Sequence, residues 1–280
     1  MDLGLRGVHV LVTGASGGIG LETIRLYCSK PPAFAALGAN VTAHYNSNVA
    51  PIKALLDSTP RVITRLQWIQ ADLSREDDVK RMFASLAKMD YGPVQIVIVN
   101  HGYWPPVDVP LAEMSLDQWN STLSTNLTSS FLVCREYLKE LAKTSAEVKD
   151  KASIVLIGST AGKYGEAGHV DYSVTKSAMM YGLTMTLKNE IVKIAPKGRV
   201  NCVAPGWVKT PMAESALSDP QVVYRALATT PLKKVASPLD IANQIAVLSS
   251  STVSGHVTGQ VLMVEGGMEG RLLNKPEDVV

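Results

Sequence analysis

Short apolar runs rich in β-branched residues recur along the chain, separated by longer stretches in which apolar residues follow helical spacing. Strands covered by helices on both faces are buried on both faces, so they read as near-continuous apolar runs. Their alternation with helical stretches is typical of βαβ units. The pattern therefore predicts an α/β fold, a Rossmann-type, doubly wound parallel sheet with helices on both faces. The strands are expected at Val8–Val12, Asn40–Ala43, Leu66–Ile69, Val94–Val99, Ser153–Ile157, Arg199–Val203 and Gln260–Val264.

No linker rich in glycine, serine or proline divides the 280 residues, so we expect one domain over residues 1–280. Pro31 and Pro32 interrupt the first helical stretch, since proline removes a backbone donor. Residues 143–151 are polar and predict a surface loop. Residues 205–238 contain several prolines and small residues, and this composition predicts a mobile loop that covers the substrate site. Residues 268–280 form a tail that either reaches a neighbouring subunit or is disordered.

Composition narrows the class of protein. Hydrophobic residues make up 46% of the chain and charged residues 19%, which fits a globular protein with a sizeable core. The net charge is +2 with no dense Lys/Arg run, so no nucleic-acid partner is expected. No apolar run reaches the ~18 residues of a membrane span, and no secretory signal is evident, so we expect a cytoplasmic protein. The spacing of the cysteines and histidines predicts neither disulfides nor a metal site.

A glycine-rich turn, Thr13–Gly20, follows the first apolar run and precedes a helical pattern. Glycine lets the backbone turn tightly and approach a ligand, while free N–H groups and the helix dipole at the helix start favour negative charge. Because the turn lies between a strand and a helix in a βαβ unit, it predicts a pyrophosphate site of a dinucleotide.

The second strand ends without the carboxylate that would bind the ribose 2′-hydroxyl of NAD. Its absence favours NADP(H) over NAD(H), because a carboxylate would repel a 2′-phosphate. No arginine stands there to pair with the phosphate either. Ser16, Asn46 and Ser47 are the candidate hydrogen-bond donors, with His44 as a further contributor.

Tyr172 and Lys176 lie one helical turn apart. A phenol exchanges protons poorly at neutral pH, and a neighbouring ammonium group improves it by stabilising the phenolate. The pair alone is common on helices. Ser159 follows the strand Ser153–Ile157, and ligands bind outside the carboxyl ends of parallel strands, so all three side chains are expected to face one crevice.

With these residues, the chain resembles a short-chain dehydrogenase/reductase, of the 3-oxoacyl reductase-like branch, from Val8 to about Gly267. The resemblance implies an NAD(P)-dependent oxidoreductase that moves a hydride between the cofactor and a ketone or secondary alcohol. The motifs stand in the family's order: Thr13–Gly20, Asp72-Leu73, Asn100-His101-Gly102, Asn126, Ser159, Tyr172, Lys176 and Pro205–Thr210. Asn100-His101-Gly102 departs from the family's Asn-Asn-Ala-Gly motif, and its His101 is expected to alter the crevice wall.

The resemblance also assigns roles. Tyr172 is implied as general acid in reduction, Ser159 as hydrogen-bond donor to the substrate oxygen, and Lys176 as the group that holds the nicotinamide ribose. Asn126 is implied to fix a water that relays protons to Lys176. The implied cofactor contacts are Gly14, Ser16, Gly18, Ile19, Gly20, Asn46, Ser47, Asp72, Leu73, Asn100, Gly102, Tyr172, Lys176, Pro205, Gly206, Val208 and Thr210.

Aromatic residues and His169 in loops after the strand ends are candidates for the substrate pocket. They are Trp104, Tyr164, His169 and Trp207. The stretches Ser115–Lys143 and Asp171–Ala195 carry apolar stripes that pack on the sheet, and the resemblance implies that they also form the interface of a homo-oligomer, usually a tetramer. Two alternatives stay open: an NAD-dependent alcohol dehydrogenase of the same family, and a non-catalytic dinucleotide-binding regulator.

Overall fold

A computed structural model describes residues 2–28, 37–58 and 65–270. In these ranges seven parallel strands form one sheet in the order β3-β2-β1-β4-β5-β6-β7. The predicted strands are confirmed, with ends shifted by one or two residues. They are β1 (His9–Val12), β2 (Asn40–Tyr45), β3 (Leu66–Gln70), β4 (Ile96–Val99), β5 (Ser153–Ile157), β6 (Arg199–Pro205) and β7 (Val261–Val264).

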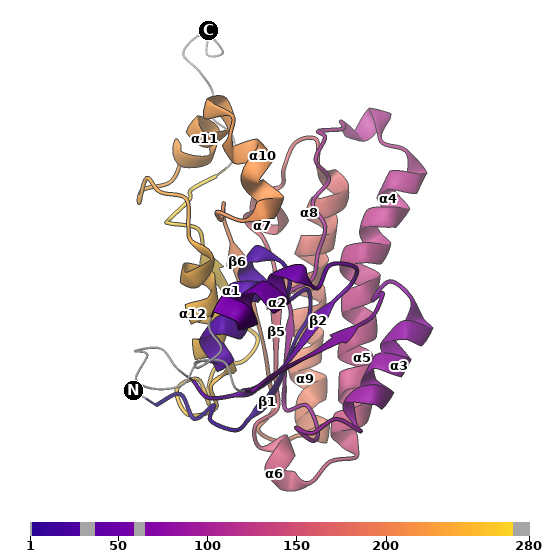
Figure 1. The fold of residues 1–280 in the computed structure, drawn as a ribbon. Helices are drawn as coiled ribbons and strands as arrows, with labels where there is room; N and C mark the ends of the chain where they lie inside the picture. The colour runs from indigo at the N-terminus through magenta and orange to yellow at the C-terminus, as the bar shows by residue number, and fades with distance from the viewer. Residues whose placement is uncertain (1, 29–36, 59–64, 271–280) are drawn as a thin grey trace, which may run out of the picture.

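Helices cover both faces of the sheet, so the doubly wound architecture is also confirmed (Figure 1). One face is packed by α1 (Gly18–Cys28), α2 (Ala50–Ser58) and α12 (Pro238–Ser249). The other is packed by α3 (Glu76–Leu86), α5 (Ser129–Ala142) and α9 (Thr184–Ile194). Strand side chains alternate between the two cores: in β5, Ile154 and Leu156 face one core, while Val155 and Ile157 face the other. All four are buried, which explains why the strand reads as a continuous apolar run.

The two long helical stretches on the second face are each interrupted by a π-helical turn. α4 (Leu116–Leu123) runs through η2 (Ser124–Thr128) into α5, and α8 (Val170–Ser177) runs through η3 (Ala178–Leu183) into α9. Such turns insert a residue into a helix and are frequent at functional sites. The expected helical stretches are present, but the sequence pattern did not predict these turns.

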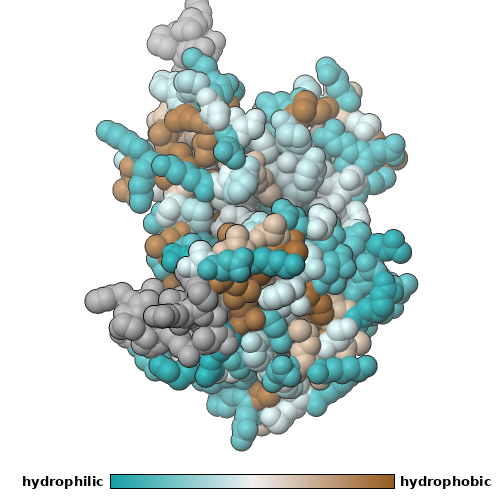
Figure 2. Space-filling model, in the orientation of Figure 1, coloured by the Kyte–Doolittle hydropathy of each residue, from teal (hydrophilic) through white to brown (hydrophobic). Residues whose placement is uncertain are grey.

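Short helices follow the carboxyl ends of the strands. α7 (Thr160–Tyr164) begins after β5, and η4 (Pro211–Ala213), α10 (Glu214–Leu217) and α11 (Pro220–Leu227) follow β6. In Figure 1, α10 and α11 stand at the upper left and α4 at the upper right, and Figure 2 shows the surface notched between them. Residues 205–238, expected as a mobile segment over the site, therefore include three helices.

The surface loop expected at residues 143–151 contains a short helix, α6 (Ala146–Lys149). The 310 turn η1 (Leu111–Glu113) lies in the loop before α4. The Pro31-Pro32 interruption and residues 271–280 of the tail fall outside the described residues.

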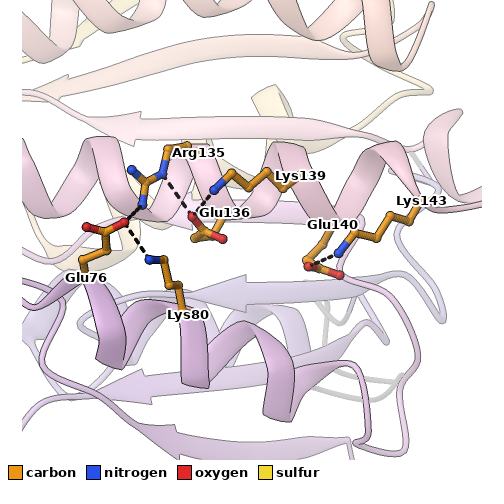
Figure 3. A network of polar contacts seen from close by, with 7 residues as sticks. All are labelled: Glu76, Lys80, Arg135, Glu136, Lys139, Glu140 and Lys143. Atoms are coloured by element: carbon orange, nitrogen blue, oxygen red, sulfur yellow. Dashed lines mark hydrogen bonds and ion pairs between the residues drawn. The ribbon is translucent and has the colours of Figure 1, made fainter.

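Ion pairs join α3 to α5 on the second face (Figure 3). The Arg135 guanidinium lies 2.7 Å from the Glu76 carboxylate and 3.0 Å from that of Glu136, and Lys80 and Lys139 extend the network at each end. Glu76 and Lys80 are about half exposed, so their pair contributes little to stability, whereas the Glu136 carboxylate between Arg135 and Lys139 is buried.

Candidate active site

Two side chains hold the glycine turn in place: Asn100, which follows β4, and His44, which belongs to β2. The Asn100 amide donates from Nδ2 to the carbonyls of Thr13 and Gly14, at 3.0 and 3.1 Å. His44 Nδ1 accepts from the Gly14 N–H at 3.1 Å, and its Nε2 bonds to the Ala71 carbonyl at 3.0 Å. Burial lowers the pKa of His44 to about 4, so the ring is neutral. His44 lines the cavity, but both of its ring nitrogens bond to backbone, and its contribution to a cofactor phosphate stays a prediction.

Two glycines of the turn stand where a side chain would collide. A Cβ at Gly20 would lie 2.4 Å from the Gly14 carbonyl oxygen, and one at Gly18 would lie 2.7 Å from Thr210 Cγ2. Gly20 is thus required for packing inside the turn. The contact of Gly18 with Thr210 brings the turn against the segment after β6, which encloses the cavity from the opposite side.

A cavity of about 640 Å³ extends from the glycine turn to the end of β5. It collects most of the predicted cofactor positions, which come from the loops after β1, β2, β3, β4 and β6 and from helix α8. Those that line it are Gly14, Ser16, Gly18, Ile19, Asn46, Asp72, Leu73, Asn100, Gly102, Tyr172, Lys176, Pro205, Gly206, Val208 and Thr210. Gly20 and Ser47 do not line it. Ser74, Glu166 and Met212 do line it, although no motif or spacing had singled them out.

The end of the cavity near β2 and β3 is polar, and no lysine or arginine is among the described residues that line this end. Asn46 and Asp72 line it, and the Asp72 carboxylate accepts from the N–H and the hydroxyl of Ser74, at 3.0 and 2.6 Å. Ser47 is exposed and lies outside the lining. The donors available at this end are therefore neutral amides and hydroxyls.

Ser159, Tyr172 and Lys176 meet at the other end of the cavity. Ser159 caps α7, its Oγ accepting from the Ala161 N–H at 3.1 Å. This leaves the hydroxyl hydrogen available for an acceptor in the cavity. Lys176 Nζ donates to the Ile157 carbonyl at 2.8 Å and lies 5.6 Å from the centre of the Tyr172 ring. Burial lowers the pKa of Lys176 to about 8.

Asn126 lies behind this group rather than in the cavity wall. It belongs to the π-helical turn η2 and is fully buried. Its side-chain amide makes two hydrogen bonds to the backbone of Tyr103, donating to the carbonyl at 2.8 Å and accepting from the N–H at 2.7 Å. It therefore fixes the loop after β4 beside Gly102, where a Cβ would lie 3.4 Å from Lys176 Nζ. The water relay implied for Asn126 stays a prediction.

His101, the departure from the family motif, connects two halves of the site. Its ring bonds to the Thr13 hydroxyl at 2.8 Å and to the Ser129 hydroxyl at 2.7 Å. Ser129 in turn donates to the Thr125 carbonyl, so His101 Nε2 carries the hydrogen that Ser129 accepts. Burial lowers the pKa of His101 to about 3. The residue lines the cavity and also joins the glycine turn to the helix of Asn126.

Asp171, which the sequence analysis passed over, anchors the helix that carries Tyr172. It is fully buried, and its carboxylate accepts from Thr122 Oγ1 at 2.7 Å and from the Tyr172 N–H at 2.8 Å. Gln118 donates to it as well, at 3.2 Å. The start of α8 is thereby tied to α4.

The four residues expected at the substrate separate into two groups. Trp104 and Trp207 line the cavity, with ring centres 6.2 Å apart. Tyr164 does not, since its hydroxyl donates to the Met268 carbonyl at 2.7 Å. His169 is buried behind Trp104 and is absent from the lining.

Comparison with known proteins agrees with this geometry. The family model described as enoyl-(acyl carrier protein) reductase matches residues 15–269. The 3-oxoacyl-[acyl-carrier-protein] reductase FabG of Chlamydia pneumoniae is 31% identical over 96% of this chain and 99% of its own. A short-chain dehydrogenase/reductase structure from Brucella melitensis is 32% identical, with a TM-score of 0.80 over 96% of this chain and 99% of that one.

The chain belongs to the short-chain dehydrogenase/reductase family. It is thus an oxidoreductase of an NAD(P)-dependent family. Other relatives are named for a different activity. One of them, the 3β-hydroxysteroid dehydrogenase 1 of Eggerthella lenta, is 29% identical over 94% of each chain. In the part of the chain that the structure describes, no helix of this dehydrogenase/reductase is long and apolar enough to cross a membrane.

Proposed function

We propose that this protein transfers a hydride between NADP(H) and a ketone or secondary alcohol, with Tyr172 as general acid and base. The observation that carries the proposal is the convergence of Ser159, Tyr172 and Lys176 on the cavity that also contains the glycine turn. The glycine turn, the end of β5 and helix α8 contribute the lining at this point, so their meeting at one cavity is informative where the spacing of Tyr172 and Lys176 alone is not.

The residues divide the proton chemistry of reduction between them. Tyr172 donates its phenolic proton to the alkoxide oxygen that forms from the ketone, and Ser159 donates a hydrogen bond to the same oxygen. Lys176, held by the Ile157 carbonyl, places an ammonium charge beside the phenolate that remains. The nicotinamide, when bound, supplies the hydride. In alcohol oxidation Tyr172 accepts the proton instead.

The cavity fits a dinucleotide along its length. The glycines of the turn leave room where a Cβ would collide, and the start of α1 presents backbone N–H groups to a pyrophosphate. Asp72 and Leu73 line the cavity, and we assign them to the adenine; Val208 and Thr210 line it as well, and we assign them to the carboxamide. The lack of a carboxylate at the end of β2 supports NADP(H). The neutral donors there, Asn46 and Ser74, keep NAD(H) as the second candidate.

The test is to mix the enzyme with NADPH or NADH and a panel of ketones, and to follow the absorbance of the reduced nicotinamide. We expect turnover with NADPH and its loss in Tyr172→Phe, which keeps the ring and removes the proton. Trp68→Phe, on the outer strand β3 away from the cavity, is the matched control. Unchanged turnover in Tyr172→Phe would overturn the mechanism, and the absence of turnover in the wild-type enzyme would favour a binding regulator.

We also infer that the protein forms a homo-oligomer and acts in the cytoplasm without a nucleic-acid partner. The homo-oligomer is supported by an apolar groove along α5 and α9, which is lined by Leu127, Phe131, Leu138 and Leu183 among others. Phe131 is 44% exposed, an unusual exposure for a large ring within an apolar surface. The Arg135 guanidinium lies 5.2 Å from the centre of the Phe131 ring and pairs with Glu76 on α3, so the groove is apolar with a charged edge. Phe131→Glu should lower the molar mass measured by light scattering, while Lys80→Glu, on α3, should not.

A further inference from the structure

Trp104 forms one wall of the cavity and is held between two other rings. The imidazole of His169 stacks on it with centres 4.6 Å apart and planes inclined by 13°. Trp207 meets it edge to face, at 6.2 Å and 75°. Both tryptophans line the cavity, whereas His169 is 1% exposed and lies behind the wall. The two indoles thus make an apolar corner of the cavity that Tyr172 also lines, and the ring of His169 backs Trp104.

The chain on both sides of Trp104 is fixed as well. On one side, Tyr103 is gripped through its backbone N–H and carbonyl by the amide of Asn126, at 2.7 and 2.8 Å. On the other side, the Pro105 carbonyl accepts from His169 Nε2 at 2.9 Å. The indole therefore has little freedom to swing out of the cavity wall. Such preorganisation lowers the entropy cost of binding a ligand against the ring.

His169 joins the loop of Trp104 to the helix of Tyr172. It immediately precedes α8, and its loop contacts the Trp104 loop closely enough that a Cβ at Gly168 would lie 2.8 Å from Asp108 Cβ. The Val109 N–H donates to the Gly168 carbonyl at 2.9 Å, and the Asp108 carboxylate lies 3.6 Å from His169 Nδ1. The position of the aromatic wall is thus set by the same helix that sets the position of Tyr172.

We propose that Trp104 selects substrates with an apolar ring next to the carbonyl, and that His169 is a positioning residue that holds Trp104 in place. The proposal rests on the proposed function, because it concerns the ketone that Tyr172 protonates. An indole face in an apolar corner favours the flat or puckered face of a ring, through stacking and burial, more than it favours a short chain. A ketone with a ring beside the carbonyl would place that ring against Trp104 while its oxygen faces Ser159 and Tyr172.

The first measurement is ketone binding in the absence of chemistry. Tyr172→Phe saturated with NADPH is titrated by calorimetry with acetophenone, which carries a ring, and with butanone, which does not. Adding Trp104→Ala should weaken acetophenone binding by about tenfold, the size of effect that aromatic stacking and burial carry, and weaken butanone binding less. Adding Trp68→Ala instead, the matched tryptophan outside the cavity, should leave the ratio of the two affinities as it was.

The second measurement isolates His169. His169→Leu removes the ring and should lower the preference for acetophenone by about threefold to fivefold, within the range for one stacked pair. His169→Phe keeps a flat ring and should restore the preference. In a Trp104→Ala background His169→Leu should have no further effect on the ratio, since a positioning residue acts only through the ring that it positions.

A spectroscopic readout separates positioning from general damage. The near-ultraviolet circular dichroism of the Trp104–Trp207 pair is obtained as the difference between the wild type and Trp104→Phe, and it requires neither cofactor nor turnover. We expect His169→Leu to diminish it and His169→Phe to keep it. An unchanged ratio in Trp104→Ala would overturn the selection by Trp104, and an unchanged spectrum and ratio in His169→Leu would overturn the positioning role.

These outcomes differ from a failure of the proposed function. If the Tyr172→Phe enzyme still turned over ketones, the assigned chemistry would be wrong while the binding ratios continued to test Trp104. If the wild-type enzyme bound neither ketone in the NADPH complex, the proposal for Trp104 would be overturned together with the substrate class, whatever role Tyr172 has.

Discussion

The ammonium group of Lys176 donates a hydrogen bond to the backbone carbonyl of Ile157 at 2.8 Å. Ile157 is the last residue of β5, so the catalytic helix is joined to the strand that leads to Ser159. The bond also holds a charged group in a buried place, and this burial lowers the pKa of Lys176 to about 8. Two predictions concern this one contact, one on activity and one on stability.

The pH dependence of activity should show the titration of Lys176. In the free enzyme its ammonium loses its proton as the pH rises through about 8, so kcat/KM for ketone reduction should fall there. Lys176→Arg keeps the charge, because a guanidinium stays protonated far above this range, and should shift the falling limb to higher pH. Steady-state kinetics across the range provide the measurement. A falling limb that Lys176→Arg leaves in place would assign it to another group.

Removal of the same charge should stabilise the fold. Depression of the pKa from 10.5 to about 8 corresponds to about 3 kcal/mol of unfavourable free energy in the folded state at neutral pH. Lys176→Met removes this cost and loses one hydrogen bond, for an expected net gain in unfolding free energy of about 1–2 kcal/mol. Activity should be lost.

The size of this effect depends on pH. Between about pH 8 and 10.5 the unfolded wild-type chain binds more protons at Lys176 than the folded one, so wild-type stability rises with pH across this window. The advantage of Lys176→Met should therefore be full below pH 8 and vanish above 10.5. Urea unfolding at both ends of the window measures it, and an equal advantage at both ends would contradict the assignment.

His44 should make the glycine turn sensitive to acid. Its pKa is lowered from 6.5 to about 4, so in this interval the unfolded chain binds the proton more tightly and stability falls as the pH falls. A proton on Nδ1 would face the Gly14 N–H and break that bond, which should weaken NADP(H) binding as well. His44→Gln keeps an acceptor and a donor without titrating, and should reduce the pH slope of the unfolding free energy.

In His44→Gln the pH slope of the unfolding free energy should shrink rather than disappear, because the pKa of His101 is also lowered, from 6.5 to about 3. His44→Leu, which has no acceptor for Gly14, serves as the comparison and should weaken NADP(H) binding at every pH. Denaturant unfolding and cofactor titrations at neutral and acidic pH test both variants. Identical slopes in the wild type and His44→Gln would exclude the ring as the titrating group.

The sequence predicted the fold well because the features that determine it are local and periodic. A strand buried on both faces, such as Ser153–Ile157, must be continuously apolar, and its run can be read directly. The π-helical turns, by contrast, leave no trace in apolar spacing, since one inserted residue in a long helix hardly disturbs the stripe. Asn126 was found through its motif, but its grip on Tyr103 depends on that turn.

The candidate site was predictable where a residue belongs to a motif, and much less where the path of the chain between motifs decides whether a side chain faces the cavity. Tyr164 and His169 lie close to Tyr172 in sequence, yet Gly165 and Gly168 adopt positive φ angles between them, and the chain carries both side chains away from the lining. His44 and Asp171 support the site through partners distant in sequence, Gly14 and Thr122. Such pairs follow from how the loops meet in space, which spacing along the chain does not encode.

Cofactor preference should respond to one carboxylate placed at the end of β2. Asn46 lines the cavity where a 2′-phosphate would lie, so Asn46→Asp should weaken NADPH binding relative to NADH by about tenfold or more through like-charge repulsion. Ser47→Asp adds the same charge at an exposed position outside the lining and should change the ratio much less. Fluorescence titration of the two reduced cofactors measures this. Equal effects of the two substitutions would place the 2′-position elsewhere.

Asp171 should be necessary for the position of Tyr172 and, through it, for catalysis. Its carboxylate is fully buried and accepts from Thr122, Gln118 and the Tyr172 N–H. Asp171→Ala removes the acceptor of these donors in the protein interior. Each donor that stays unpaired there should lower the unfolding free energy by about 1–3 kcal/mol. We expect a lower unfolding free energy and a lower kcat, because α8 is no longer tied to α4. Asp171→Asn keeps one acceptor oxygen and should recover part of both.

Thr122→Val shows whether the contact with α4 is the part that matters. It removes the hydroxyl that donates to Asp171 at 2.7 Å while keeping the shape of the side chain. If Asp171 acts through this contact, Thr122→Val should lower stability by itself and lower it less when Asp171→Ala is already present, with a coupling energy of about 0.5–3 kcal/mol in a double-mutant cycle. Additive effects would mean that Asp171 supports Tyr172 through the first turn of α8 alone.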